Sequence, residues 1–187
     1  MKTFKSLNKT FWLLMALSAS VAVFNSCDDD KEPGGGNLTT DEGVWINGVK
    51  WATRNVGTSK RFVNNSENYG QYYTFEQAQA ACPVGWRLPT LAELESLLDT
   101  EKVEQKWIAE KNGKEFKDKA TGNTLFLPAA GHRYNGTLYF VGENGSYWSS
   151  TPYSDYTMCN LHFSSNVTDT CYFYYSGSRF SVRCVAK

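Results

Sequence analysis

The sequence predicts an α+β domain that follows an export signal and a flexible linker. Between residues 74 and 111, apolar side chains recur at the three- and four-residue intervals of amphipathic helices. From residue 124 onward, short apolar and β-branched runs alternate with turn residues, which is typical of antiparallel strands. Because the helices precede the strands as a separate block, we expect two or three helices beside an antiparallel sheet.

The N-terminal residues have the pattern of a secretory signal. Three lysines precede an apolar stretch over residues 11–24, which is shorter than the roughly 20 residues of a membrane-spanning helix. Ser26 and Cys27 follow, and then the polar run "DDDKEPGGGN". This arrangement resembles the signal of surface-exported Bacteroidetes lipoproteins. The resemblance implies a signal peptide over 1–26, a lipid on Cys27 with a flexible linker over 27–42, and a domain over 43–187. The lipid would hold the protein in the outer membrane, facing the cell exterior.

Charge and cysteine content narrow the class of protein further. The chain has 19 basic and 19 acidic residues and no basic stripe, so we expect no nucleic-acid partner. Apart from Cys27, four cysteines remain. In an exported protein, four cysteines favour two disulfides, for which three pairings are possible.

The first half of the domain contains a hairpin signal and two capping boxes. Asn47-Gly48 separates two short apolar runs, as in a two-residue β-hairpin loop. Thr74 and Thr90 are each followed three residues later by Gln or Glu, which is the pattern of a helix N-terminus. The predicted elements are a hairpin over 44–51 and helices over 75–82, 91–98 and 101–111.

The second half contains the predicted strands, and the last of them is rich in aromatic residues. If residues 171–175 form a strand, Tyr172 and Tyr174 face one side, while Phe173 and Tyr175 face the other. At least one of these pairs would then be exposed, unless another chain covers it. His162 alternates with Leu161 and Phe163, so we expect its side chain to be exposed.

Several motifs in order along the chain carry a family resemblance. They are "INGVKWATRNVG", "GQYYTFEQAQAACP", "GWRLPT", "LPAAGHR", "YWSST" and "FSVRCV". Together they resemble the Fibrobacter succinogenes major paralogous domain over residues 43–187 and, more distantly, the C-type lectin-like fold. The long-range disulfide of that fold implies a Cys82–Cys184 bond. Cys159 and Cys171 would then join two strands of a hairpin centred near residue 165.

The sequence offers little for metal or enzyme chemistry. The calcium-binding Glu-Pro-Asn and Trp-Asn-Asp motifs of lectins are missing, and Asp155 and Asp169 are the only acids after residue 150. The chain also resembles formylglycine-generating enzymes, but Ser176 stands where their second catalytic cysteine would be, and copper(I) needs two thiolates. His132, in "AAGHRY", is assigned a structural role. We therefore expect no enzyme activity, no catalytic residues, no metal and no cofactor.

Aromatic side chains are concentrated at the C-terminal end. Residues 147–187 contain ten of them in 41 positions, interleaved with Ser, Asn, Thr and Gly. This composition is typical of antibody-like binding surfaces, and aromatic rings also stack on sugars. The sequence thus predicts a calcium-independent binding module for a protein or glycan ligand at the cell surface. The expected ligand-binding residues are Tyr156, His162, Tyr172, Phe173, Tyr174, Tyr175 and Arg179.

Three alternatives remain open. One is a structural or fimbria-associated subunit of the cell envelope, whose aromatic face packs on a partner chain. Another is a degenerate enzyme of the formylglycine-generating type. The third concerns the origin of the surface, because residues 153–179 resemble the diversified region of retroelement variable proteins. In that case Cys159 and Cys171 would be products of diversification rather than a purpose-built disulfide.

Overall fold

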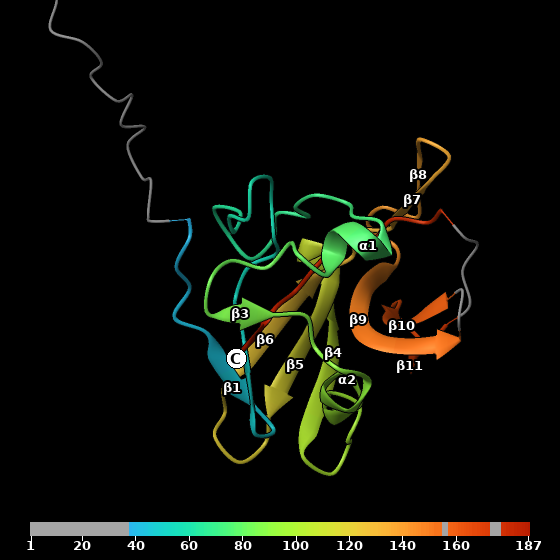
Figure 1. Cartoon of the computed structure of the whole chain (residues 1–187). Helices are drawn as coiled ribbons and strands as arrows, with labels where there is room; N and C mark the ends of the chain where they lie inside the picture. The colour runs from blue at the N-terminus through green and yellow to red at the C-terminus, as the bar shows by residue number, and fades with distance from the viewer. Residues whose placement is uncertain (1–37, 155–156, 173–176) are drawn as a thin grey trace, which may run out of the picture. The chain divides into compact units, whose positions relative to one another are not determined.

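The computed structural model describes residues 38–154, 157–172 and 177–187 (Figure 1). All of them belong to one compact unit, Pro33–Lys187. The predicted signal peptide, Cys27 and the linker up to residue 37 therefore lie outside the described residues. No helix among the residues described is both long enough and apolar enough to cross a membrane.

The domain begins with a hairpin and brings the C-terminus back beside it. β1 (Val44–Ile46) and β2 (Val49–Trp51) pair in antiparallel fashion around Asn47-Gly48, as predicted. Both turn residues have positive φ, which the twist of a tight hairpin requires. β12 (Val185–Ala186) lies between β2 and β3 (Trp86–Arg87) and completes a four-stranded sheet.

The chain before β1 already contacts the domain. Phe62 N donates to the carbonyl oxygen of Leu38 (2.6 Å), and Asp41 accepts bonds from Thr53 N (3.0 Å) and Arg54 Nε (3.1 Å). The Asp41 side chain is fully buried. Residues 38–42 are therefore part of the packed domain, although the sequence pattern had placed them in the linker.

Two helices occur where the capping boxes predict them, and both are short. α1 (Phe75–Ala78) and α2 (Leu91–Ser96) each have the reciprocal Thr and Gln or Glu cap. Ala78 and Leu94 are the residues that these helices bury. The capped starts are confirmed, but the helices end earlier than the apolar spacing suggested.

The predicted third helix is wrong, because residues 101–111 form a strand and a turn. β4 (Val103–Ile108) pairs with β5 (Gly113–Asp118), and a single turn of 3-10 helix, η1 (Ala109–Lys111), links the two strands. β6 (Thr124–Pro128) pairs with the other edge of β5 and completes this three-stranded sheet. Val103 is buried, whereas Glu104 and Lys106 are exposed and lie opposite Lys117 and Glu115. Opposite charges across the strands stabilise this pairing, and a helix would forgo it.

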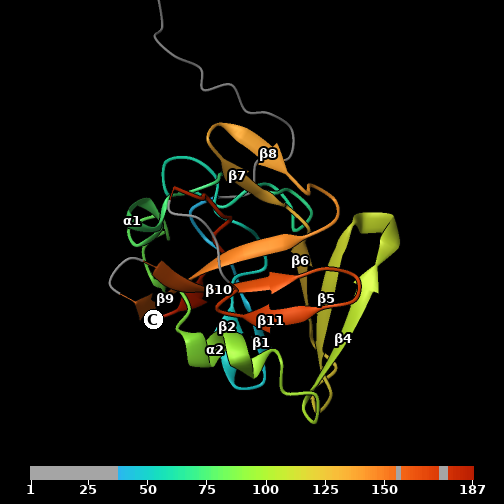
Figure 2. The same cartoon turned by 90° about the vertical axis from the view of Figure 1, so that its right-hand side faces the viewer.

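The C-terminal strands form two further sheets (Figure 2). One is the hairpin of β7 (His132–Tyr134) and β8 (Thr137–Tyr139). The other contains β9 (Gly145–Ser154), β10 (Thr157–Phe163) and β11 (Thr168–Thr170) in the order β11-β10-β9.

The strand expected over residues 171–175 is not formed at its start. β11 ends at Thr170, and Cys171 has a left-handed backbone (φ 56°) that breaks the extended run. Cys171 N still donates to the carbonyl oxygen of Asn160 on β10 (2.8 Å), one step beyond the Leu161–Thr170 pair. Phe173–Tyr175 lie outside the described residues, so the predicted division of these four rings between two faces stays a prediction.

Both disulfides join the expected cysteines. Cys82 bonds to Cys184 across 102 residues and ties the segment after α1 to the C-terminus. Cys159 bonds to Cys171 and ties β10 to the segment after β11. The pairing that the C-type lectin-like resemblance implied is thus confirmed, as is the second pairing.

An arginine lies inside the core beside Cys184. Arg183 is 1% exposed, and its guanidinium donates to Asn55 Oδ1 (2.9 Å) and to the Ala52 carbonyl oxygen (3.1 Å). Asn55 Nδ2 in turn donates to Tyr147 Oη (3.2 Å). Burial lowers the pKa of Arg183 to about 10, so it stays protonated at neutral pH.

The described domain therefore consists mostly of antiparallel β-sheets with two short helices. The helical part is smaller than the predicted α+β arrangement. One cluster of core side chains lies around Phe116 and Phe163, and a second lies under α1 around Trp148 and Phe180.

Candidate functional site

Three of the seven predicted ligand-binding residues lie in the described part of the chain. These are His162, Tyr172 and Arg179. Tyr156, Phe173, Tyr174 and Tyr175 lie outside the described residues. The site is therefore built here from the residues around the first three.

The expectation that His162 is exposed is wrong. Its side chain is on β10, and the residue is only 7% exposed. The Tyr172 ring covers it, with ring centroids 4.5 Å apart and planes inclined by 24°. Strand alternation places His162 on the opposite face of β10 from Leu161 and Phe163. It could not show that Tyr172, which follows β11, lies over that face.

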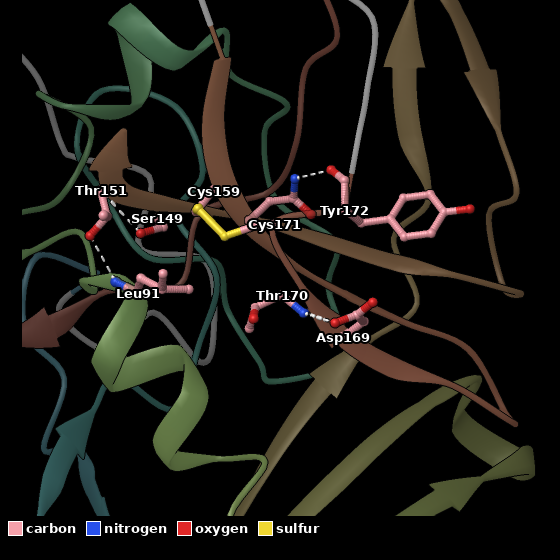
Figure 3. The surroundings of a disulfide bond; sticks show 9 residues. Leu91, Ser149, Thr151, Cys159, Asp169, Thr170, Cys171 and Tyr172 are labelled. Atoms are coloured by element: carbon pink, nitrogen blue, oxygen red, sulfur yellow. Dashed lines mark hydrogen bonds between the residues drawn. A yellow bond between two sulfur atoms is a disulfide. The ribbon is translucent and has the colours of Figure 1, made fainter. Parts of the chain in front are cut away.

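Tyr172 is 49% exposed and firmly positioned (Figure 3). Asn160 Nδ2 donates to the Tyr172 carbonyl oxygen (2.7 Å), and the adjacent Cys171 is bonded to Cys159. Figure 3 shows the tyrosine ring pointing away from the disulfide. A ring held in this way loses little conformational entropy when a ligand binds to it.

A second group of exposed apolar residues lies on the β7–β8 hairpin and was missed in the sequence. Exposed fractions here range from 39% to 52%, for Leu138, Tyr139, Phe140 and Val141. Figures 1 and 2 both show this hairpin projecting from the rest of the described domain. The sequence does contain a signal for this exposed group. A half-buried hairpin strand alternates apolar and polar residues, whereas the run "TLYFVG" after the Asn-Gly turn does not.

His132 links this hairpin to the core. Its ring stacks on Tyr139 (centroids 5.5 Å apart) and lies 5.9 Å from the Phe140 ring. On its inner side it meets the edge of the buried Phe180 ring at 6.2 Å. The structural role predicted for His132 agrees with its 9% exposure.

We call Tyr139, Phe140 and Tyr172, with the two imidazoles beneath them, the aromatic platform. Burial lowers the pKa of both histidines, and the charge of His132 lowers the pKa of His162 further. Backbone pairing relates the two histidines, because Gly131, next to His132, bridges to Gly145, and His162 pairs with the adjacent Ser146. At neutral pH both are uncharged, so the exposed rings rest on an apolar, uncharged base.

Arg179 lies at the border of the hairpin. Its backbone pairs with that of Arg133, with N–H to carbonyl distances of 2.8 and 2.9 Å. Among the described residues no carboxylate forms an ion pair with either guanidinium. Two half-buried arginines therefore bring positive charge to this border.

The residues described contain no cluster of three or more His, Cys, Asp or Glu side chains suited to a metal ion. Cys171, the cysteine that matches the first catalytic thiol of formylglycine-generating enzymes, is engaged in its disulfide with Cys159. What the described geometry offers is a contact surface of aromatic rings with arginines beside it.

Comparison with known proteins identifies the family. No curated protein and no solved structure shows a significant match to the chain. The sequence profile of the Fibrobacter succinogenes major domain matches residues 33–186, which is most of the chain and includes the whole aromatic platform. The chain therefore belongs to the Fibrobacter succinogenes major domain family.

Proposed function

We propose that this protein is a binding module that attaches a partner protein to the cell surface through the aromatic platform. The observation that carries the proposal is the support of the exposed rings. Tyr139 and Tyr172 are 40% and 49% exposed, and each stacks on a buried histidine. Exposed apolar patches on the surface of a protein mark interaction sites, and large rings stacked on buried side chains form such a patch here.

The shape and composition favour a protein over a small ligand. The hairpin projects from the domain, so a partner would fit around it rather than enter a cavity (Figure 2). Tyrosine and arginine are, with tryptophan, the residues enriched among those that contribute most of the binding energy at protein interfaces. Arg133 and Arg179 favour a partner with acidic residues at the rim of its contact surface, since complementary charge speeds association.

We further propose that a lipid anchors the protein to the membrane and that partner binding does not require calcium. Cys27 would carry the lipid, and the residues between it and Leu38 would separate the domain from the outer membrane. The N-terminal sequence pattern supports this part of the proposal. Binding through rings and arginines needs no cation, so we propose that chelators leave partner binding intact. We also propose that the protein is not an enzyme.

The test is a capture experiment on bacterial cells that export the full chain. Cells would be screened against host and bacterial surface proteins, with calcium and with a chelator. A Tyr139→Ala/Tyr172→Ala variant removes two platform rings. Trp45→Ala is the matched control, because Trp45 is 55% exposed on β1 in a different sheet.

A partner that is bound equally with calcium and chelator, lost in the double variant and kept in the control would support the proposal. A stable oligomer of the protein that buries the platform would instead favour the structural or fimbria-associated subunit. The proposed diversification of residues 153–179 needs a separate, genomic test. It requires a near-identical template repeat and a reverse transcriptase gene beside the locus, and without them it is rejected.

A further inference from the structure

A pocket separate from the aromatic platform lies where α1, the start of α2 and the strands β9 and β10 meet. Its volume is about 770 Å³, which is within the usual range of small-molecule sites. Residues from four elements and their flanks line it, including Phe75, Arg87, Leu88, Ser150, Tyr153 and Met158. We infer that this pocket binds an uncharged sugar ring.

The apolar part of the pocket suits the C–H face of a pyranose. Leu88 is 4% exposed, and Met158 is half-buried. The half-buried Phe75 ring is held edge-on by Trp148, at 5.9 Å between centroids. Tyr153 is 64% exposed, so its ring provides a wall that is open to a ligand. An aromatic ring with a polar end offers flat apolar area and a hydroxyl at once.

The charge of Arg87, the charged residue among those that line the pocket, is neutralised by Glu93 on α2. Arg87 donates to both carboxylate oxygens of Glu93, at 2.8 and 2.6 Å. This hydrogen bond is the main reason why the pKa of Glu93 is lowered, so the carboxylate stays ionised at neutral pH. Glu93 also accepts from Thr90 N (2.7 Å), which fixes the pair at the start of α2. A ligand with a net charge would meet no unmatched opposite charge here.

The remaining polar groups fit hydroxyls. The Arg87 side chain is 41% exposed despite its ion pair. Ser150 Oγ donates to the Pro89 carbonyl oxygen (3.2 Å), which leaves its own lone pairs as acceptors. Gln79 is exposed at the rim and has both a donor and an acceptor. Donors and acceptors around an apolar floor match a ring that carries several hydroxyls better than they match a hydrocarbon or an ion.

This inference does not rest on the proposed function of the platform. The pocket and the aromatic platform are separated by a row of ring contacts. This row runs from Phe75 through Trp148 and Phe180 to His132. None of the platform residues lines the pocket. Each site can therefore be removed without the other.

The experiment measures sugar binding to the full chain by ligand-observed NMR. The detergent that keeps the full chain in solution must have no sugar headgroup, because such a headgroup would compete with the sugar probes. The probes are the methyl pyranosides of glucose, galactose and mannose, with glucuronic acid and glucosamine as charged counterparts. The variants are Tyr153→Ala, the ring-preserving Tyr153→Phe, Trp45→Ala as an exposed control, and Tyr139→Ala/Tyr172→Ala for the platform.

We expect at least one neutral pyranoside to bind more tightly than either charged probe. Tyr153→Ala should weaken its binding about tenfold, whereas Tyr153→Phe should change it by less than about threefold. Trp45→Ala and the platform variant should bind like the parent protein. The inference is overturned if no neutral pyranoside binds at tens of millimolar, if a charged probe binds as tightly, or if Tyr153→Ala has no effect.

Discussion

The Tyr172 ring stacks on the imidazole of His162, with centroids 4.5 Å apart, although the two residues are on different segments of the chain. His162 is buried in β10, and Tyr172 is half-exposed in the segment after β11. A disulfide and a hydrogen bond from Asn160 fix the backbone that carries the tyrosine. This pair therefore connects the core to the surface that we propose to bind a partner.

The stacked pair should be energetically coupled. Stability would be measured by urea unfolding for Tyr172→Ala, His162→Ala and the double variant. We expect a coupling free energy of about 0.5–1.5 kcal/mol, the usual value for an aromatic pair beyond its buried area. Strict additivity of the two single changes would mean that the stack contributes nothing.

Stability should fall as the pH drops from about 6.5 toward 5. His132 and His162 are the only histidines in the chain, and burial lowers both pKa values below the ordinary 6.5. Above the unfolded pKa both states are neutral, so stability is complete there. As the pH falls, the unfolded chain takes up protons first, and folding loses free energy until the folded pKa is reached.

The carboxylates contribute to acid unfolding at lower pH. Glu93 and Asp118 have lowered pKa values in the folded protein, so their contribution is lost only below their ordinary values of 4.5 and 3.8. A His132→Gln/His162→Gln variant should therefore show a flat stability profile between pH 6.5 and 5. A slope that persists in this variant would assign the effect to other groups.

The two disulfides should have different consequences. Replacing Cys82 and Cys184 by alanine opens a loop of 102 residues and should cost roughly 4–5 kcal/mol of unfolding free energy. Replacing Cys159 and Cys171 opens a loop of 12 residues and should cost roughly 3 kcal/mol, but it also releases the backbone before Tyr172. We expect the second pair of changes to weaken partner binding more than the first, as measured on folded protein at low temperature. Equal binding would show that the platform does not need this bridge.

The buried guanidinium of Arg183 should contribute strongly to the stability of the folded domain. Arg183→Ala leaves Asn55 Oδ1 and the Ala52 carbonyl without their donor inside the core, and it also leaves a cavity. We expect a loss of about 3–5 kcal/mol in thermal or urea unfolding. Arg179→Ala is the control, because this half-buried arginine should change stability by less than about 1 kcal/mol.

The proposed lipid anchor has a direct consequence for localisation. Cys27→Ser removes the only thiol available for lipidation near the apolar N-terminal stretch. We expect the parent protein in the outer-membrane fraction and the variant outside it. A variant that stays in that fraction would show that something other than the Cys27 lipid holds the protein there.

The local signals in the sequence predicted the parts of the fold that short patterns determine. Asn47-Gly48 and the capping boxes at Thr74 and Thr90 each depend on backbone groups within a few residues, and all three are present. The sequence of residues 101–111 fits a helical period and a strand period equally well, because charged and apolar residues are mixed there. Only the cross-strand pairs with β5, such as Glu104 with Lys117, decide for a strand.

The site depended on long-range packing, which the sequence did not show. Aromatic composition pointed to Tyr172, but no short pattern indicated the left-handed backbone at Cys171 or the stacking of the Tyr172 ring on His162. Likewise, the exposure of Tyr139 and Phe140 follows from a hairpin that leaves the body of the domain. The Cys82–Cys184 pairing came from family resemblance, since the spacing of the cysteines allows three pairings.

The most direct test of the platform is the dissociation constant of a captured partner for Tyr172→Ala beside Tyr172→Phe. Phenylalanine keeps the ring that stacks on His162, whereas alanine removes it. We predict that Tyr172→Ala weakens binding at least about tenfold and that Tyr172→Phe stays within about threefold of the parent protein. An unchanged dissociation constant in Tyr172→Ala would contradict the account.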